Sequence, residues 1–182
     1  VIAIIGILAS VALPAYREYI VTSKLATVFT GVSGLQRAIE TTYSRKGETV
    51  FNNTNYNCTT QVCFQQYIGM SDVPTVPSGL ASVATGAASE GAGTCSAATW
   101  TDSSVVGPAV DSGAIILTGV DDNSDDLIDN ALDGVVMTLH PSITGSGVSW
   151  LVNTGLAGTL GTSDEMEVLT CRWLHENVNG QG

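Results

Sequence analysis

The sequence of 182 residues has few of the side chains and motifs on which most enzyme active sites depend. It contains two histidines, His140 and His175, and we expect both to be ordinary surface or sheet residues. It lacks the GxSxG and HExxH motifs and a glycine-rich phosphate-binding loop. No nucleophile, base and acid stand out as a set, so the chain is predicted not to be an enzyme.

Basic residues are also scarce, and they are unevenly placed. Six Lys and Arg residues stand against 17 Asp and Glu residues, which gives a net charge of −11. Five of the six lie in the first 46 residues, whereas residues 47–182 carry fifteen acids against Arg172 alone, a net charge of −14. DNA and anionic lipid are bound by positive surfaces. Direct nucleic-acid binding by residues 47–182 is therefore not expected.

Charge is absent altogether from Val1–Leu13 (VIAIIGILASVAL), which precedes Pro14. A run of 10–14 apolar residues is more typical of a core helix or a signal peptide than of a membrane-spanning helix, which needs about 20. A signal peptide is followed by a cleavage site and loop sequence. Here apolar residues continue at helical spacing, at Val28, Val32, Leu35, Ile39 and Tyr43. The pattern disfavours a signal peptide and predicts one helix from Val1 to about Ser44.

Residues 3–20, AIIGILASVALPAYREYI, resemble the N-terminal helix of type IV pilins, including its glycine at Gly6 and its proline at Pro14. The string is specific to the pilin and pseudopilin superfamily. In that family it follows a methylated N-terminal phenylalanine and a glutamate at the fifth position, so the resemblance places about eight family residues before Val1. With those residues the apolar run would reach about 20 residues, the length that spans a bilayer.

This resemblance implies an α+β fold, in which a long N-terminal helix packs on a four-stranded antiparallel sheet. The start of the helix would anchor the chain in the inner membrane before assembly and form the filament core afterwards. The implied core residues are Val1, Ile4, Ile5, Gly6, Leu8, Val11, Leu13 and Pro14. Glycine and proline weaken a helix, so the segment from Gly6 to Pro14 is expected either to melt in the fibre or to form a simple kink.

Residues 1–46 are expected to form the helix and residues 47–182 a globular head. Within the head, residues 47–112 are rich in Ser, Thr, Asn, Gly and Ala and predict an exposed loop region with a short helix at about 62–69. Residues 113–182 predict the sheet, because β-branched and aromatic runs alternate there with turn residues. The four predicted strands are 114–120, 134–140, 147–153 and 167–174.

Four cysteines allow three pairings, and an even number in an exported protein favours disulfides over free buried thiols. The expected pairs are Cys58–Cys63 and Cys95–Cys171. In the pilin sheet a strand ending in TLxP precedes a strand with a tryptophan, and a cysteine follows near the C-terminus. Here these features are Thr138–Pro141, Trp150 and Cys171. Val152 stands where many relatives carry the partner of that cysteine, so Cys95 is the candidate partner instead.

Two N-x-[ST] sequons, at Asn52 (NNT) and Asn57 (NCT), are possible glycosylation sites. Such sequons also occur often by chance.

An acidic segment, DDNSDDLIDNALDG at 121–134, has six aspartates among its fourteen residues and predicts a calcium site. Calcium takes 6–8 oxygen ligands, which loops supply at alternate positions. Positions 1, 3, 5, 7 and 9 of such a loop would be Asp121, Asn123, Asp125, the Leu127 carbonyl and Asp129. Leu132 stands at position 12, whereas a register shifted by one residue places Asp133 there. Magnesium fits less well, and a solvated acidic turn is the alternative.

Together these features predict a major type IV pilin, which polymerises with its own copies into an extracellular filament for adhesion, motility or support of DNA uptake. The implied partners are other copies, the inner membrane before assembly and the pilus assembly machinery. The alternatives are a minor pilin, a major pseudopilin of type II secretion, and a soluble calcium-dependent binding module behind a cleaved export signal.

Overall fold

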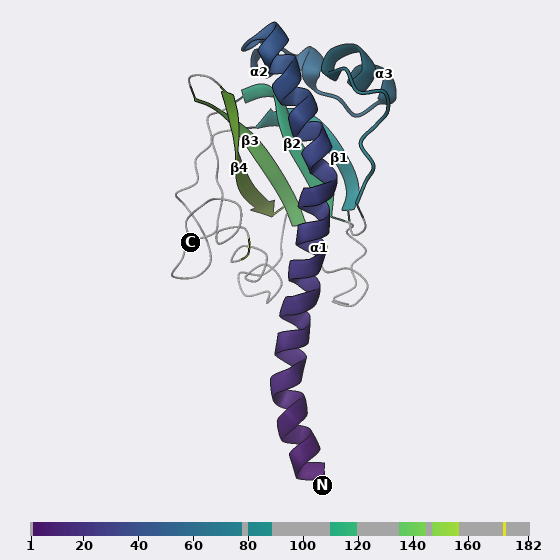
Figure 1. Cartoon of the computed structure of the whole chain (residues 1–182), viewed down its shortest axis with the longest axis vertical. Coiled ribbons are helices and arrows are strands. Elements are labelled where there is room, and N and C mark those ends of the chain that lie inside the picture. Colours follow the sequence, from purple (N-terminus) through teal and green to yellow (C-terminus); the bar gives the residue numbers. More distant parts are fainter. Residues whose placement is uncertain are drawn as a thin grey trace.

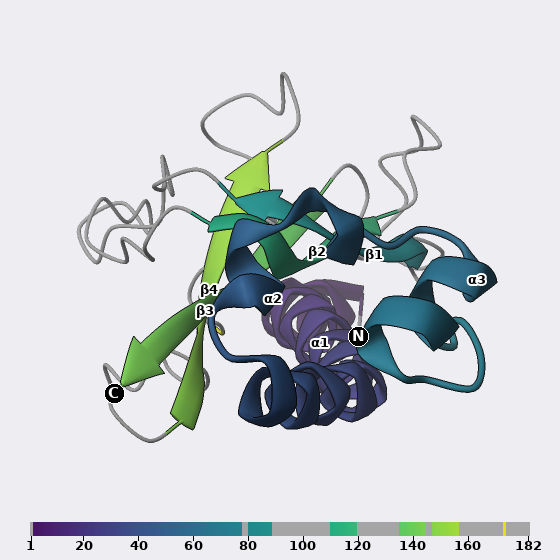
Figure 2. The same ribbon diagram turned by 90° about the horizontal axis from the view of Figure 1, so that it is seen from above.

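A computed structural model describes residues 2–77, 80–88, 110–119, 135–144, 147–156 and Trp173. A long helix, α1 (Ile2–Lys46), packs its second half against one face of a four-stranded antiparallel sheet (Figures 1 and 2). The first half of α1 projects beyond the head. The predicted α+β architecture of one long helix on a four-stranded antiparallel sheet is confirmed.

The helix α1 continues through Gly6 and Pro14 and ends close to the predicted position. Arg45 and Lys46 occupy its last turn, where cations interact favourably with the helix dipole. Gly47 follows with a φ of 66°, and its N–H donates to the Tyr43 carbonyl at 2.7 Å. A glycine in the left-handed region is the usual helix stop, because it has no Cβ to clash.

Short helical segments follow: α2 (Thr49–Asn52), η1 (Thr54–Tyr56), α3 (Gln61–Cys63) and the π-helical turn η2 (Phe64–Ile68). The last two together match the short helix predicted at about 62–69. Gly69 ends η2 with a φ of 79°, and its N–H donates to the Phe64 carbonyl at 2.8 Å. Phe64 and Ile68 are buried, so this turn is fixed to the core of the head.

The sheet has the order β1-β2-β3-β4, with each strand antiparallel to its neighbour. Its strands are β1 (Leu80–Ala88), β2 (Val110–Gly119), β3 (Val135–Thr144) and β4 (Gly147–Leu156). Strands β2, β3 and β4 contain the described parts of the runs predicted at 114–120, 134–140 and 147–153. The predicted strand at 167–174 lies outside the described residues except for Trp173.

Strand β1 and the start of β2 correct the prediction that residues 47–112 form an exposed loop region. The sequence of β1, LASVATGAA, contains one leucine, one valine and one threonine among small side chains, so its local preference for a strand is weak. Its partner β2 decides the outcome: Val83 lies opposite Leu117 and Thr85 lies opposite Ile115. Pairing and burial against β2 therefore override a weak local preference.

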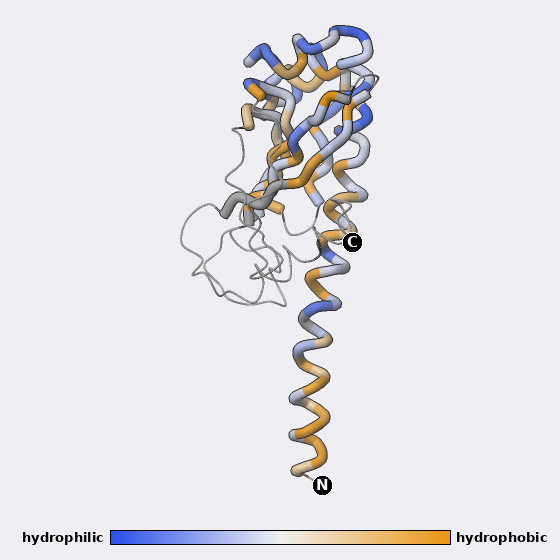
Figure 3. Tube along the Cα trace, turned by 90° about the vertical axis from the view of Figure 1, so that its left-hand side faces the viewer, coloured by the Kyte–Doolittle hydropathy of each residue, from blue (hydrophilic) through white to orange (hydrophobic). Residues whose placement is uncertain are grey.

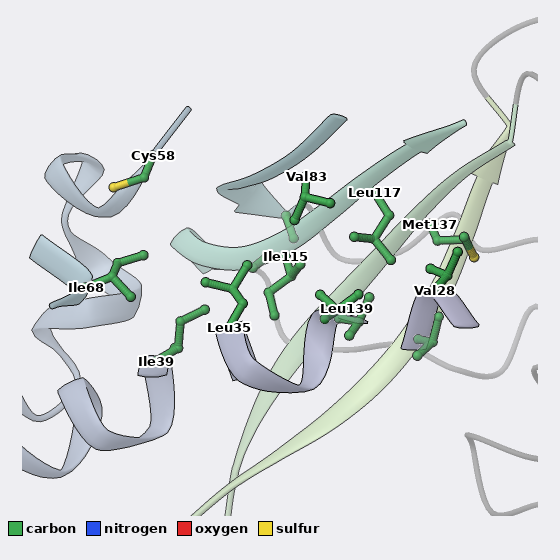
Figure 4. Packing of buried hydrophobic residues seen from close by; sticks show 14 of the residues in the cluster. Val28, Leu35, Ile39, Cys58, Ile68, Val83, Ile115, Leu117, Met137 and Leu139 are labelled. Atoms are coloured by element: carbon green, nitrogen blue, oxygen red, sulfur yellow. The ribbon is translucent and has the colours of Figure 1, made fainter. Parts of the chain in front are cut away.

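The core lies between α1 and the sheet. Figure 4 shows Leu35 of α1 next to Ile115 of β2, Val28 next to Met137 of β3, and Ile39 on the side of Ile68. The residues in this cluster are almost completely buried, and burial of an aliphatic side chain contributes about 1.5–3 kcal/mol relative to exposure. Val28, Val32, Leu35 and Ile39, predicted to join the helix to the sheet, are all buried. Tyr43 is partly buried, and its ring packs on Phe51.

Glycine permits one close contact between β2 and α2. Gly113 has a φ of 76°, and a Cβ at this position would lie 2.8 Å from the ring of Phe51. The adjacent Ser112 hydroxyl donates to the Val50 carbonyl at 2.7 Å and accepts from the Asn53 N–H at 3.2 Å. These contacts hold α2 against the sheet.

Candidate functional site

The projecting half of α1 is an apolar surface with no cover from the head. Every described residue from Ile2 to Tyr16 is exposed, and Val11 is 71% exposed. Figure 3 shows this half as mainly hydrophobic along its length. The predicted core residues Ile4, Ile5, Gly6, Leu8, Val11, Leu13 and Pro14 all lie here, and Val1 lies outside the described residues. An apolar surface of this kind is stable only when lipid or another protein removes it from water.

By length and composition, α1 can also cross a membrane. Core helices of soluble proteins can be as long and as apolar, but they are mostly buried, whereas only 6% of the apolar 18-residue stretch of α1 is buried. A signal sequence near an N-terminus can also be this long and apolar. The helix differs from the usual signal sequence because it continues without a break into the packed core of the head.

Two polar contacts join the second half of α1 to distant parts of the chain. The Trp150 indole N–H of β4 donates to the Glu40 carboxylate at 2.8 Å, and the Thr42 hydroxyl donates to the Ile68 carbonyl at 2.8 Å. The hydrogen bond between Thr42 and Ile68 is buried. Glu40 and Trp150 are 110 residues apart and no local motif links them, so their contact could not be predicted from the sequence.

The cysteine prediction is confirmed for one pair. Cys58 and Cys63 form a disulfide across a separation of five residues, and Cys58 is completely buried. The Cys95–Cys171 pair lies outside the described residues and stays a prediction. Val152, which stands where many pilins have a cysteine, is buried in β4 opposite Leu139.

The predicted calcium ligands, Asp121, Asn123, Asp125, Leu127, Asp129 and Asp133, all lie outside the described residues. They fall between the end of β2 at Gly119 and the start of β3 at Val135, two strands that are adjacent in the sheet. Within the described ranges, no three His, Cys, Asp or Glu side chains are grouped closely enough to hold a metal ion.

The asparagines of both sequons lie on the surface of the head. Asn52 is exposed at the end of α2, and Asn57 is exposed just before the disulfide. The Asn57 side-chain amide donates to the Asp111 carbonyl at 3.3 Å. The side-chain nitrogen to which a glycan would be attached is therefore hydrogen-bonded to β2 at Asn57.

His140 lies in β3, opposite Leu151, and is 2% exposed. It is therefore a sheet residue, which is one of the two settings expected for the histidines. His175 lies outside the described residues.

No family model matches the chain. A fimbrial protein of Eikenella corrodens, EcpC, is 49% identical over 47 residues, which cover 26% of this chain and 31% of that protein. A fimbrial protein of Moraxella nonliquefaciens is 54% identical over 41 residues, which cover 22% and 27%. The matched part thus spans about three tenths of these curated relatives. Over this part the chain is similar to fimbrial proteins, in agreement with its resemblance to type IV pilins.

Proposed function

We propose that this chain is the structural subunit of a type IV pilus, an extracellular filament built from many copies of it. The observation that carries the proposal is the projecting half of α1, which exposes apolar side chains on all sides next to a folded head. The partial similarity to fimbrial proteins supports it. Adhesion, motility and support of DNA uptake are the roles that such a filament would serve.

The shape of the subunit suits a polymer. A helix that is apolar all around can lie among identical helices on every side, whereas a one-sided apolar stripe would be satisfied by a single partner. Contacts between different surfaces of successive copies extend into a helical filament when the rotation from copy to copy does not close a ring. Before assembly the same residues would lie in the inner membrane, from which the assembly machinery would collect them.

Imaging of filaments sheared from the source cells tests this proposal. We expect electron microscopy to show a fibre with the projecting half of α1 at its centre and the head outside. Filaments that lack this chain would contradict the proposal. A short periplasmic polymer would indicate the pseudopilin alternative, and a soluble monomer would indicate the binding module.

A pair of variants on the same helix sharpens the test. Leu8→Lys places a charge in the proposed filament core, where burial of an unpaired charge is very costly, and should abolish filaments. Ser44→Lys adds the same side chain at an exposed site in the last turns of α1 and should leave filament yield unchanged. Equal yields from the two variants would show that the projecting half is not the core.

We also propose that the acidic segment at 121–134 binds calcium between β2 and β3. Six neighbouring carboxylates repel one another, and a cation with many oxygen ligands relieves this repulsion. A ligand that binds the folded state stabilises it, by about 2.7 kcal/mol at one hundred times its dissociation constant.

Removal of calcium by a chelator should therefore lower the melting temperature of the head, and added calcium should restore it. Asp125→Ala should remove this response, whereas Asp72→Ala, at an exposed residue outside the segment, should keep it. A melting temperature that is the same with chelator and with calcium would rule out the site.

A further inference from the structure

Among the described residues, strand β1 is one end of the sheet. Its pairing with β2 is regular from Ser82 to Gly86 and shifts register only near the two ends of the strand, so its middle carries none of the usual protections of an edge strand in its own sequence. Edge strands expose unpaired N–H and C=O groups, and natural proteins protect them with charged residues, proline or a covering segment. The nine residues of β1, LASVATGAA, include no charge and no proline. Ala81, Ser82 and Ala87 are exposed small residues that offer no steric barrier to another strand.

A covering segment lies at the middle of this edge. We call residues 56–63, which end at the disulfide, the strap. The Thr85 N–H donates to the Cys58 carbonyl at 3.0 Å, so this amide points away from β2. The Thr85 hydroxyl donates to the Tyr56 carbonyl at 2.6 Å and accepts from the Cys58 N–H at 2.9 Å. Three hydrogen bonds thus join the strap to one buried residue of β1.

The disulfide connects this contact to the rigid part of the head. Cys63 immediately precedes η2, whose Phe64 and Ile68 are buried and whose Ile68 carbonyl accepts the Thr42 hydroxyl of α1. Figures 1 and 2 both place α3, which contains Cys63, beside the β1 end of the sheet. Within the strap, Tyr56 and Cys58 are buried in the core, whereas the residues between the cysteines are exposed and polar apart from Val62. The segment between the cysteines therefore has little apolar surface of its own to hold it in place.

We propose that the Cys58–Cys63 disulfide locks the strap over the edge of β1, and that a chain with two thiols exposes this edge for pairing with β1 of a second copy. Two identical edge strands can pair antiparallel about a twofold axis. Formation of the disulfide takes two electrons and two protons from the thiols. A disulfide of another protein or small molecule accepts them and is reduced to a dithiol. Oxidation would thus remove a competing mode of self-association. The inference does not depend on the filament role.

The test uses the full chain in detergent, so that α1 is equally covered in every sample. The variant carries Cys58→Ser and Cys63→Ser, which leaves the other two cysteines unchanged. Below the concentration at which the variant associates, amide hydrogen exchange at Thr85 should become at least tenfold faster than in the oxidised chain, while exchange in β3 and β4 stays the same. Sedimentation should show self-association at a concentration at least tenfold lower than for the oxidised chain.

A second pair of variants shows whether β1 is the surface involved. Adding Ala87→Lys to the cysteine variant places a charge on the β1 edge and should reverse the self-association without slowing Thr85 exchange. Ser149→Lys, an exposed residue of β4 at the other end of the sheet, is the matched control and should not reverse it.

Three results would overturn the proposal. Unchanged exchange at Thr85 would show that the strap stays in place without the disulfide. Equal acceleration in all four strands would show general loss of the fold instead of local release. Self-association that Ser149→Lys reverses and Ala87→Lys does not would assign the pairing to another edge.

Discussion

The two halves of α1 belong to one continuous helix and have opposite relations to the rest of the chain. In the projecting half, apolar residues such as Ile5 and Leu8 are 60% and 65% exposed. In the second half, Val28 and Leu35 are buried against the sheet. Helix formation alone therefore does not determine what these side chains do. The first half supplies surface for association, and the second half supplies the stability of the head.

The largest expected effect compares the same substitution in the two halves. Leu35→Ala removes a buried side chain and leaves a cavity, which should lower the free energy of unfolding by about 2–5 kcal/mol. Leu8→Ala removes an exposed side chain and should change it by less than about 0.5 kcal/mol. Denaturant unfolding of the full chain in detergent, followed by tryptophan fluorescence, measures both. Equal losses would show that the projecting half also stabilises the head.

The contact between Glu40 and Trp150 is expected to have the next largest effect. Glu40→Ala leaves the partly buried indole N–H without its acceptor, which should cost about 1–3 kcal/mol. In Trp150→Phe the donor is already absent, so a further Glu40→Ala change should cost less. This double-mutant cycle isolates the hydrogen bond from the packing of the two side chains. Additive losses would mean that the hydrogen bond contributes nothing to stability.

Two glycines of α1 give the smallest and most specific comparison. A Cβ at Gly31 would lie 2.7 Å from the Pro77 ring, whereas a Cβ at Gly34 would meet nothing within 4 Å. Gly34→Ala should stabilise the head by up to about 1 kcal/mol, because alanine is the better helix former. Gly31→Ala has the same helical advantage but should lose about 1–3 kcal/mol to overpacking. Thermal unfolding of both variants tests the difference, and similar stabilisation would show that Pro77 moves away easily.

Much of the fold could be predicted because several signals are local. The spacing of Val28, Val32, Leu35 and Ile39 defines one face of a helix, and Gly47 after two basic residues marks its end. The strands β2, β3 and β4 have β-branched or aromatic runs between turn residues. The short spacing of Cys58 and Cys63 allowed their pairing to be predicted from the chain alone. The calcium ligands, the second disulfide and the sequons stay predictions.

What could not be predicted depends on residues far apart in the sequence. Strand β1 has weak intrinsic preference for a strand and exists because β2 pairs with it. The bond between Glu40 and Trp150, and the contact of the strap with Thr85, join segments that have no common motif. Such contacts become visible only once the chain is folded.

The sequence by itself determined that this protein has a long helix with an apolar first half, an acidic head, and strands separated by turns. Each of these follows from composition or from periodicity within a short stretch of the chain. The tertiary structure decided which half of the helix is covered and which edge of the sheet the strap protects. It did so because burial and hydrogen bonding depend on the distance between groups in space, and the order of residues along the chain does not fix that distance.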